Sequence, residues 1–206
     1  MINRIKKAVR RVMGRIAAAL NRISGGAITP NAITIIGFAM HVPIALLVAS
    51  RHNVWAAILL FIFGLFDTLD GELARLQKRD STAGMLLDAS TDRLKEMLIY
   101  SGAAYALALS SHPATAAWAA AACGASISVS YVKAKGEAAV AMSGKKLTHS
   151  ELNHLFDGGI LSFEIRMFIL VVGLFANQLV IAVAIIAVFA SYTALQRLIR
   201  ITKQLS

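Results

Sequence analysis

Long apolar stretches occupy most of this chain, and they limit the folds that it can adopt. They run over about residues 32–50, 54–76, 81–110, 114–142, 158–176 and 178–201. A helix of roughly 20 apolar residues crosses a hydrocarbon core about 30 Å thick with all its backbone hydrogen bonds made internally. The pattern therefore predicts an all-α integral membrane protein, a bundle of six transmembrane helices.

The composition supports a membrane location and argues against nucleic acid as a partner. Hydrophobic residues make up 57% and charged residues 16% of the chain, and the mean hydropathy is +0.66, which is too apolar for an ordinary soluble domain. The net charge is +10, but the basic residues are dispersed between the apolar stretches instead of forming one patch. We expect them to face anionic membrane lipids.

Residues 1–24 have a different pattern from the rest of the chain. They contain seven Lys or Arg and no acidic residue, and their apolar residues recur at helical spacing: Ile5, Val9, Val12, Ile16 and Leu20. This predicts an amphipathic helix at the membrane surface, followed by a six-helix domain over residues 25–206. Gly25-Gly26 and Thr29-Pro30-Asn31 break the first helix, and Pro30 with Thr29 or Asn31 marks the start of the first span. A cleaved signal peptide is the alternative, but basic residues continue to Arg22 without an uninterrupted apolar core.

An even number of spans places both termini on one side of the membrane. With the N-terminus in the cytosol, only Arg51 lies in an outer loop, and the other basic residues near span ends are cytosolic: Lys78, Arg79, Lys145, Lys146, Arg197, Arg200 and Lys203. Positive residues favour the cytosolic side. We expect a multi-pass protein of the cytoplasmic membrane with the polar turn 77–82 in the cytosol. The loop 143–157 is then also cytosolic, as a half-turn helix, a flap or a plain connector.

Four aspartates flank this turn in an otherwise apolar region. Asp67 and Asp70 precede it, Asp88 and Asp92 follow it, and helical spacing places each pair on one face of its helix. Four carboxylates facing each other across a hairpin repel one another unless cations neutralise them. Oxygen ligands without Cys or His favour Mg²⁺ or Mn²⁺ over zinc. The alternative is a purely structural set of charges, neutralised by Arg75 and Arg93.

Written as Asp67-x2-Asp70-Gly71-x2-Ala74-Arg75-x8-Gly84-x3-Asp88-x3-Asp92, the segment resembles the signature of the CDP-alcohol phosphotransferases, or CDP-alcohol phosphatidyltransferases, at all eight fixed positions. The resemblance implies a metal-dependent membrane enzyme. Such an enzyme transfers a phospho-substituent from a CDP-linked donor to the hydroxyl of an acceptor alcohol and releases CMP. The resemblance also implies a six-helix fold with an amphipathic N-terminal helix, and a homodimer.

The same resemblance implies a role for each signature residue. Two Mg²⁺ or Mn²⁺ ions would be held by Asp67, Asp70, Asp88 and Asp92, and Asp92 would also be the general base. The residues that would bind the CDP donor are Asn31, Gly71, Ala74, Arg75, Thr82 and Gly84. The planar fork of Arg75 suits a diphosphate, and the two glycines permit close approach. Asn31 and Thr82 either touch the nucleotide or cap a helix.

A second segment bears on the acceptor. Residues 130–137, SYVKAKGE, resemble the SYxKAxxE segment of the bacterial phosphatidylinositol phosphate synthases, one branch of this family. This implies inositol phosphate as the acceptor and CDP-diacylglycerol, or a related CDP-lipid, as the donor. The basic residues that would bind the acceptor phosphate are Lys133, Lys135, Arg166, Arg197 and Arg200. The alternative for the two lysines is snorkelling at the membrane interface.

Two other functions are open at this point. Glycerophosphate would suit the same basic pocket, so a phosphatidylglycerophosphate synthase, or a family enzyme with another acceptor, is one alternative. We favour the inositol branch because residues 88–93 are DASTDR, whereas glycerophosphate enzymes tend to carry DPxxDK. A non-catalytic transporter with an acidic cation site is the other alternative, but transporters usually show inverted repeats and acids near the membrane midplane.

Overall fold

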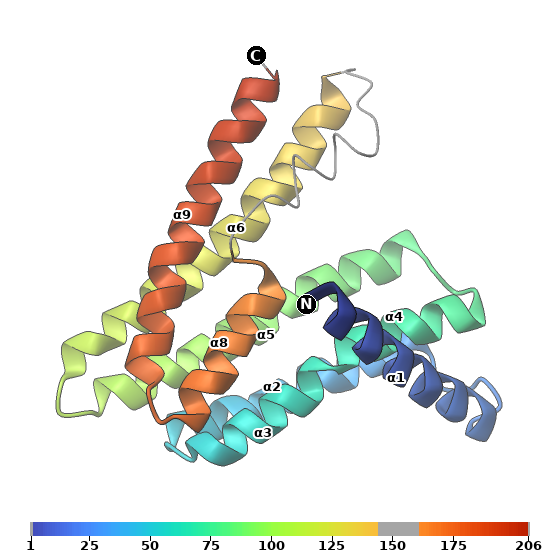
Figure 1. Ribbon diagram of the computed structural model, residues 1–206, viewed down its shortest axis with the longest axis horizontal. Helices are drawn as coiled ribbons and strands as arrows, with labels where there is room; N and C mark the ends of the chain where they lie inside the picture. The colour runs from blue at the N-terminus through green and yellow to red at the C-terminus, as the bar shows by residue number, and fades with distance from the viewer. Residues whose placement is uncertain (1, 144–160, 206) are drawn as a thin grey trace. The chain divides into compact units, whose positions relative to one another are not determined.

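The computed structural model describes residues 2–143 and 161–205, and within these ranges every regular element is a helix. The chain divides into two compact units, residues 1–99 and 100–206, which are described separately. Unit 1 contains α1 (Ile2–Ile23), α2 (Pro30–Ala49), α3 (Asn53–Gly64), α4 (Phe66–Gln77) and the first part of α5 (Thr82–Ala108). Unit 2 contains the rest of α5, then η1 (Pro113–Thr115), α6 (Ala116–Met142), α8 (Phe163–Phe175) and α9 (Leu179–Leu205). Figure 1 shows these elements in chain order.

The turn between α1 and α2 follows the predicted break. Gly25 and Gly26 have φ of 58° and 82°, a left-handed conformation that glycine adopts without steric cost. Thr29 then caps α2, since its Oγ1 accepts a hydrogen bond from the Ala32 N–H at 3.2 Å, and Pro30 occupies the first helical position. The prediction that the first span begins at Pro30 is confirmed.

The apolar face of α1 packs largely against protein. Met13 and Ala17 are buried in a core cluster with Ile33 of α2 and Leu69 and Leu73 of α4. Two residues of the predicted stripe instead face outward, Val12 (50% exposed) and Ile16 (40% exposed). The apolar surface of α1 is therefore shared between the protein core and the exterior.

The predicted stretch 54–76 is helical but has a break at Leu65. α3 ends at Gly64 and α4 begins at Phe66, with the Leu65 N–H donating to the Ile62 carbonyl at 3.2 Å. The break places Asp67 in the first turn of α4, where the helix dipole favours a negative charge.

Unit 2 is built around the pair α6 and α9, which lie side by side (Figure 1). Small buried residues line α6, among them Ala119, Ala122 and Ala125, and Ala182 and Ala190 do so on α9. Small side chains allow two helix backbones to approach closely, as membrane helices commonly do. Arg197 of α9 adds a polar link, since its Nη1 donates to the Val129 carbonyl of α6 at 3.2 Å.

Four helical stretches among the described residues are long and apolar enough to cross a membrane: Pro30–Ala49, Asn53–Gln77, Pro113–Met142 and Leu179–Leu205. Helices also occupy the other two predicted stretches, but α5 carries charged residues at 88, 92, 93, 95 and 96, and α8 has 13 residues. The predicted cytosolic loop lies, after Ser143, outside the described residues.

Candidate active site

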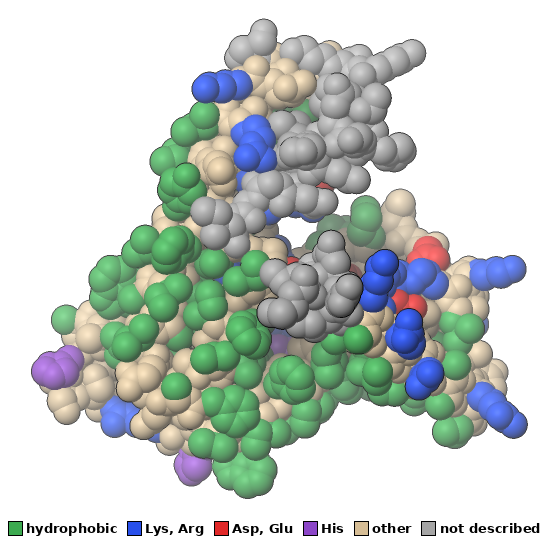
Figure 2. Space-filling view, viewed as in Figure 1, with side chains coloured by type: hydrophobic (Ala, Val, Ile, Leu, Met, Phe, Trp, Pro, Cys, Tyr) green, Lys and Arg blue, Asp and Glu red, His purple; other side chains and the backbone are tan. Residues whose placement is uncertain are grey.

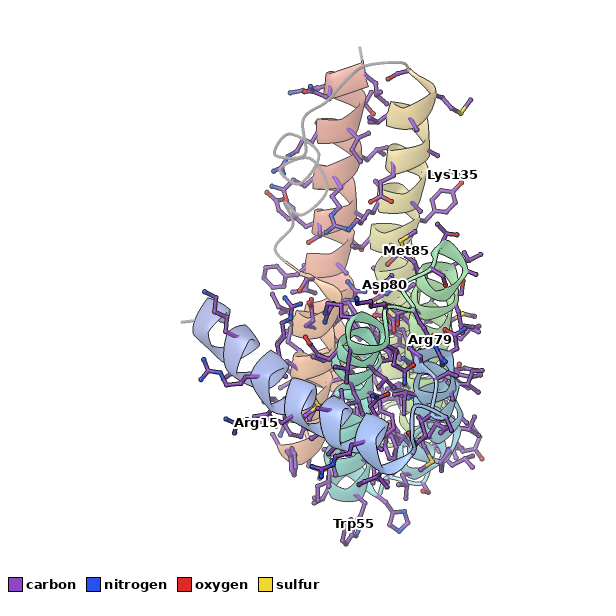
Figure 3. All side chains as sticks on the ribbon, turned by 90° about the vertical axis from the view of Figure 1, so that its right-hand side faces the viewer. Arg15, Trp55, Arg79, Asp80, Met85 and Lys135 are labelled. Carbon is purple, nitrogen blue, oxygen red and sulfur yellow. The ribbon has the colours of Figure 1, made fainter. Side chains whose placement is uncertain are left out.

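The α4–α5 hairpin positions the aspartates. α4 ends where Lys78 adopts a left-handed conformation, with φ of 52°. α5 begins at Thr82, and Ser81 caps it, because the Ser81 Oγ accepts a hydrogen bond from the Gly84 N–H at 3.0 Å. Figure 3 shows Arg79, Asp80 and Met85 together at this turn. The chain thereby reverses direction, and the two predicted acidic pairs come from facing helices.

Three of the four aspartates converge. Asp67, Asp70 and Asp88 each offer a carboxylate oxygen, and these oxygens lie within 4.8 Å of one another. Asp70 is 6% exposed, and the Asp88 Oδ1 is buried with no hydrogen-bond partner among the described residues. One buried and two half-buried carboxylates at this separation repel one another, and a bound cation would offset this repulsion. An all-oxygen donor set with an unsatisfied inward atom fits Mg²⁺ or Mn²⁺.

Asp92 makes different contacts. Its Oδ1 accepts from the Lys95 Nζ at 3.2 Å and its Oδ2 from the Arg93 Nη2 at 3.5 Å. The same Lys95 Nζ donates to the Asp67 Oδ1 at 2.5 Å. A buried lysine thus joins Asp92 of α5 to Asp67 of α4. Asp92 as a fourth metal ligand stays a prediction.

Two residues of this site were missed by the sequence analysis. Lys95 is one, and its signal was a charge three residues after Asp92 in the charged first half of α5. Thr34 of α2 is the other: it is 4% exposed, and its Oγ1 donates to the Asp70 Oδ2 at 2.6 Å. Thr34 thereby fixes the orientation of one Asp70 oxygen.

A cavity of ≈ 580 Å³ adjoins the acidic cluster. Asp70 and Asp88 line it together with all six residues predicted to bind the CDP donor: Asn31, Gly71, Ala74, Arg75, Thr82 and Gly84. Asn31 and Thr82 both follow a capping residue, Thr29 and Ser81 respectively. Neither residue is therefore the cap, and both side chains border the cavity instead.

Gly84 is where α5 approaches the start of α2. A Cβ atom added at Gly84 would lie 3.1 Å from the Ser81 Oγ and 3.4 Å from the Asn31 Oδ1. A larger residue would push into both the helix cap and the cavity lining. At Gly71 an added Cβ would meet only the Arg75 guanidinium, at 3.6 Å. The absence of a side chain at Gly71 therefore leaves space in the cavity beside Arg75.

Arg75 pairs with a glutamate and not with the aspartates. Its Nη2 donates to the Glu72 Oε1 at 2.6 Å, and the Arg10 Nε of α1 donates to the same oxygen at 3.1 Å. Figure 2 shows basic side chains gathered around acidic ones over the α1 and α4 part of unit 1. The alternative in which Arg75 neutralises the aspartates is therefore wrong, whereas Arg93 does pair with Asp92.

The five residues predicted to bind the acceptor phosphate all belong to unit 2. Arg166 of α8 is 1% exposed and its Nη1 donates to the Leu161 carbonyl at 3.1 Å, while Arg197 is 7% exposed. On α6, Lys133 lies 4.0 Å from Glu137, and the exposed Lys135 has its Nζ 5.9 Å from the centre of the Tyr131 ring. Arg200 lines a separate hollow on α9, which none of the other four lines.

Fold and site together define a class of protein: an all-helical membrane protein with an acidic cation site beside a cavity. The family model for CDP-alcohol phosphatidyltransferase matches residues 27–195. This chain belongs to the CDP-alcohol phosphatidyltransferase family. It is therefore a metal-dependent transferase of phospholipid biosynthesis, and Mg²⁺ or Mn²⁺ is its cofactor.

Relatives of known sequence point to one branch of the family. The chain is 32% identical over 181 residues to phosphatidylinositol phosphate synthase of Corynebacterium glutamicum, covering 84% of this chain and 77% of the relative. It is 34% identical over 104 residues to archaetidylinositol phosphate synthase of Pyrococcus horikoshii, covering 50% and 54%.

Solved structures similar to this chain belong to the same branch of the family. The crystal structure of Mycobacterium tuberculosis phosphatidylinositol phosphate synthase with CDP-DAG bound superposes with a TM-score of 0.77 at 26% identity, over 93% of this chain and 94% of that chain. The structure of the same enzyme in complex with manganese and citrate gives a TM-score of 0.77 at 26% identity, over 92% and 88%.

Proposed function

We propose that this protein transfers the phosphatidyl group of CDP-diacylglycerol to a hydroxyl of inositol phosphate and releases CMP. The observation that carries the proposal is the convergence of Asp67, Asp70 and Asp88 beside a cavity that is lined by all six residues predicted to bind the CDP donor. The branch is supported by the Corynebacterium glutamicum relative and by the Mycobacterium tuberculosis crystal structure, both of which are phosphatidylinositol phosphate synthases.

Asp67, Asp70, Asp88 and Asp92 would hold two divalent ions in this proposal. When bound, these ions neutralise the diphosphate and make its phosphorus more electrophilic. The protein supplies the rest of the donor site. Asn31, Thr82 and Gly84 border the cavity where the helix ends meet, and Arg75 would exchange part of its bonding to Glu72 for the diphosphate oxygens.

Asp92 would act as general base. The acceptor hydroxyl oxygen attacks the lipid-bearing phosphorus, the bond from that phosphorus to the CMP oxygen breaks, and the hydroxyl proton passes to an Asp92 oxygen. The hydrogen bonds from Lys95 and Arg93 orient the Asp92 carboxylate. A carboxylate is a weak base for an alcohol, so orientation and charge neutralisation must supply most of the rate.

The acceptor phosphate would be bound by Lys133, Lys135, Arg166, Arg197 and Arg200. This proposal is supported by the hydrogen bonds to backbone carbonyls that hold the Arg166 and Arg197 guanidinium groups in place, and by the exposure of Lys135. Glycerophosphate offers the same dianion, so the acceptor must be tested directly.

A panel of acceptors with CDP-diacylglycerol is the test of this proposal. We expect CMP release, measured by chromatography, with inositol phosphate, and less than about a tenth of that rate with serine or free inositol, because both lack the phosphate and a missing charged contact costs at least about 1.4 kcal/mol. Glycerophosphate keeps the phosphate but lacks the inositol ring, and we expect a lower rate with it than with inositol phosphate. EDTA should abolish the reaction and added Mn²⁺ should restore it. A higher rate with glycerophosphate would assign the protein to that branch, and EDTA-insensitive turnover would refute a metal enzyme.

Lys135→Ala should raise the KM for inositol phosphate about tenfold and leave the KM for CDP-diacylglycerol within about twofold, because a charge-assisted hydrogen bond to phosphate contributes roughly 1.5–3 kcal/mol. The exposed position of Lys135 makes this substitution safe for folding. Steady-state kinetics with each substrate varied in turn provides the measurement, and Lys7→Ala, at an exposed lysine of α1 in unit 1, is the control. An unchanged KM for inositol phosphate would remove Lys135 from the acceptor site.

We also propose how the chain sits in the membrane. Six spans would include α5, with its charged first half at the cytosolic end, and the region of α8. Residues 1–24 would form a juxtamembrane helix on anionic lipids and residues 25–206 the six-helix domain. The outward-facing Val12 and Ile16 support this placement of α1, as does Arg15, which projects away from the bundle in Figure 3. The active site would open to the cytosol, and the protein would be a homodimer.

A further inference from the structure

A buried ammonium group lies inside the acidic cluster. Lys95 is 1% exposed, and its Nζ lies 2.5 Å from the Asp67 Oδ1 and 3.2 Å from the Asp92 Oδ1. Asp67 belongs to α4, whereas Lys95 and Asp92 belong to α5. One side chain therefore makes two charged bonds that connect the two halves of the hairpin.

A charged lysine at this depth has to be explained. Removing an ammonium group from water costs several kcal/mol, which its partners must offset. Two carboxylates do so here, and in return the ammonium separates charges that would otherwise repel each other. The neighbouring buried Glu96 forms an ion pair with another residue, because the Arg93 Nε lies 3.5 Å from the Glu96 Oε2. Lys95 is thus matched to the aspartates.

We propose that Lys95 is a positioning residue that acts as a resident cation of the active site. It holds Asp67 and Asp92 together across the hairpin and offsets part of the cluster's negative charge whenever divalent ions are absent. The inference rests on the proposed metal site and extends it: the hairpin stays assembled between metal-loading events, and the affinity for the metal is lower than the aspartates alone would give.

Lys95→Met tests this inference, because it removes the charge and keeps most of the volume. In EDTA we expect the melting temperature of the purified protein in detergent to fall by about 5–10 °C, since the half-buried carboxylates of Asp67 and Asp92 lose their shared partner. The Kd for Mn²⁺, measured by titration calorimetry, should tighten about tenfold because a like charge has left the site. By linkage, saturating Mn²⁺ should then raise the melting temperature of the variant by about 4 °C more than that of wild type.

Three further variants distinguish an effect of the lysine charge from a general loss of folding. Lys95→Arg keeps the charge and should keep the wild-type Kd for Mn²⁺. The double variant Lys95→Met with Asp92→Asn removes one charge of each sign and should recover most of the stability that Lys95→Met loses in EDTA. Lys203→Met, at an exposed lysine of α9, should change neither quantity.

The outcomes separate this inference from the proposed function. If Lys95→Met lowers the melting temperature equally in EDTA and in Mn²⁺, with an unchanged Kd, the lysine only fills space and the inference is overturned, while the metal site stands. A double variant no more stable in EDTA than Lys95→Met also overturns it. A wild-type protein that neither binds nor is stabilised by Mn²⁺ overturns the metal site and the role of Lys95 together.

Discussion

Asp70→Asn is expected to reduce CMP release at least about 1000-fold and to weaken Mn²⁺ binding. Asp70 is the most buried member of the converging trio, and Thr34 fixes one of its oxygens at 2.6 Å. The substitution keeps the shape of the side chain but replaces a charged carboxylate oxygen with a neutral amide nitrogen. The interaction of such an oxygen with a metal ion or with a developing charge is worth about 4 kcal/mol or more. Parallel assays of CMP release and Mn²⁺ calorimetry provide the measurement.

Its matched control is Glu164→Gln, which makes the same chemical change at an exposed acid on α8. That variant should keep wild-type turnover and Mn²⁺ affinity. An Asp70→Asn protein that binds Mn²⁺ normally and still turns over would show that the three carboxylates converge without holding the cofactor.

Asp92→Asn is expected to lower kcat by roughly 10²–10⁴-fold, the range that general bases contribute. The amide accepts no proton at neutral pH, yet it keeps the size of the carboxylate beside Lys95 and Arg93. Binding of the CDP-lipid should stay within a few-fold of wild type, because Asp67, Asp70 and Asp88 keep their carboxylates for the metal and none of the residues that line the adjoining cavity is changed. Single-turnover assays and a donor-binding assay measure the two quantities separately.

The result distinguishes two roles for Asp92. Wild-type turnover would refute its role as the base. A loss of turnover together with an equal loss of donor and Mn²⁺ binding would instead assign it to cofactor binding alone. The contacts to Lys95 and Arg93 make this distinction measurable, since they hold the residue in place without the metal.

The helices and the acidic hairpin could be predicted because each depends on local pattern. Apolar stretches of membrane length set the helix positions, and Gly25, Gly26 and Pro30 marked a turn whose backbone only such residues favour. The spacing of the aspartates placed Asp67, Asp70 and Asp88 correctly, since residues three or four apart share a helix face.

What could not be predicted depends on which face of a helix meets a neighbour. Lys95 follows Asp92 by three residues, which is compatible with a lysine reaching for the interface, and only the position of α4 reveals that it turns inward. Thr34 contacts Asp70 across 36 residues of sequence, so no local pattern indicates the pair. On α1, Met13 and Ala17 adjoin the predicted stripe, and the position of α4 decides that they are the buried residues. The Ser81 cap was missed because helix boundaries shift by a residue in polar turns.

One amide near the end of α4 affects how the chain can be shortened. The Gln77 Nε2 donates to the Asn21 Oδ1 of α1 and to the Ile28 carbonyl, both at 2.8 Å, so both ends of the α1–α2 connector are tied to the same residue. Pro30 and Asn31, which border the donor cavity, follow directly after this connector. Removing α1 would therefore also remove the Asn21 contact that holds the connector beside this cavity. A shortened enzyme should retain the chain from Asn21 onward.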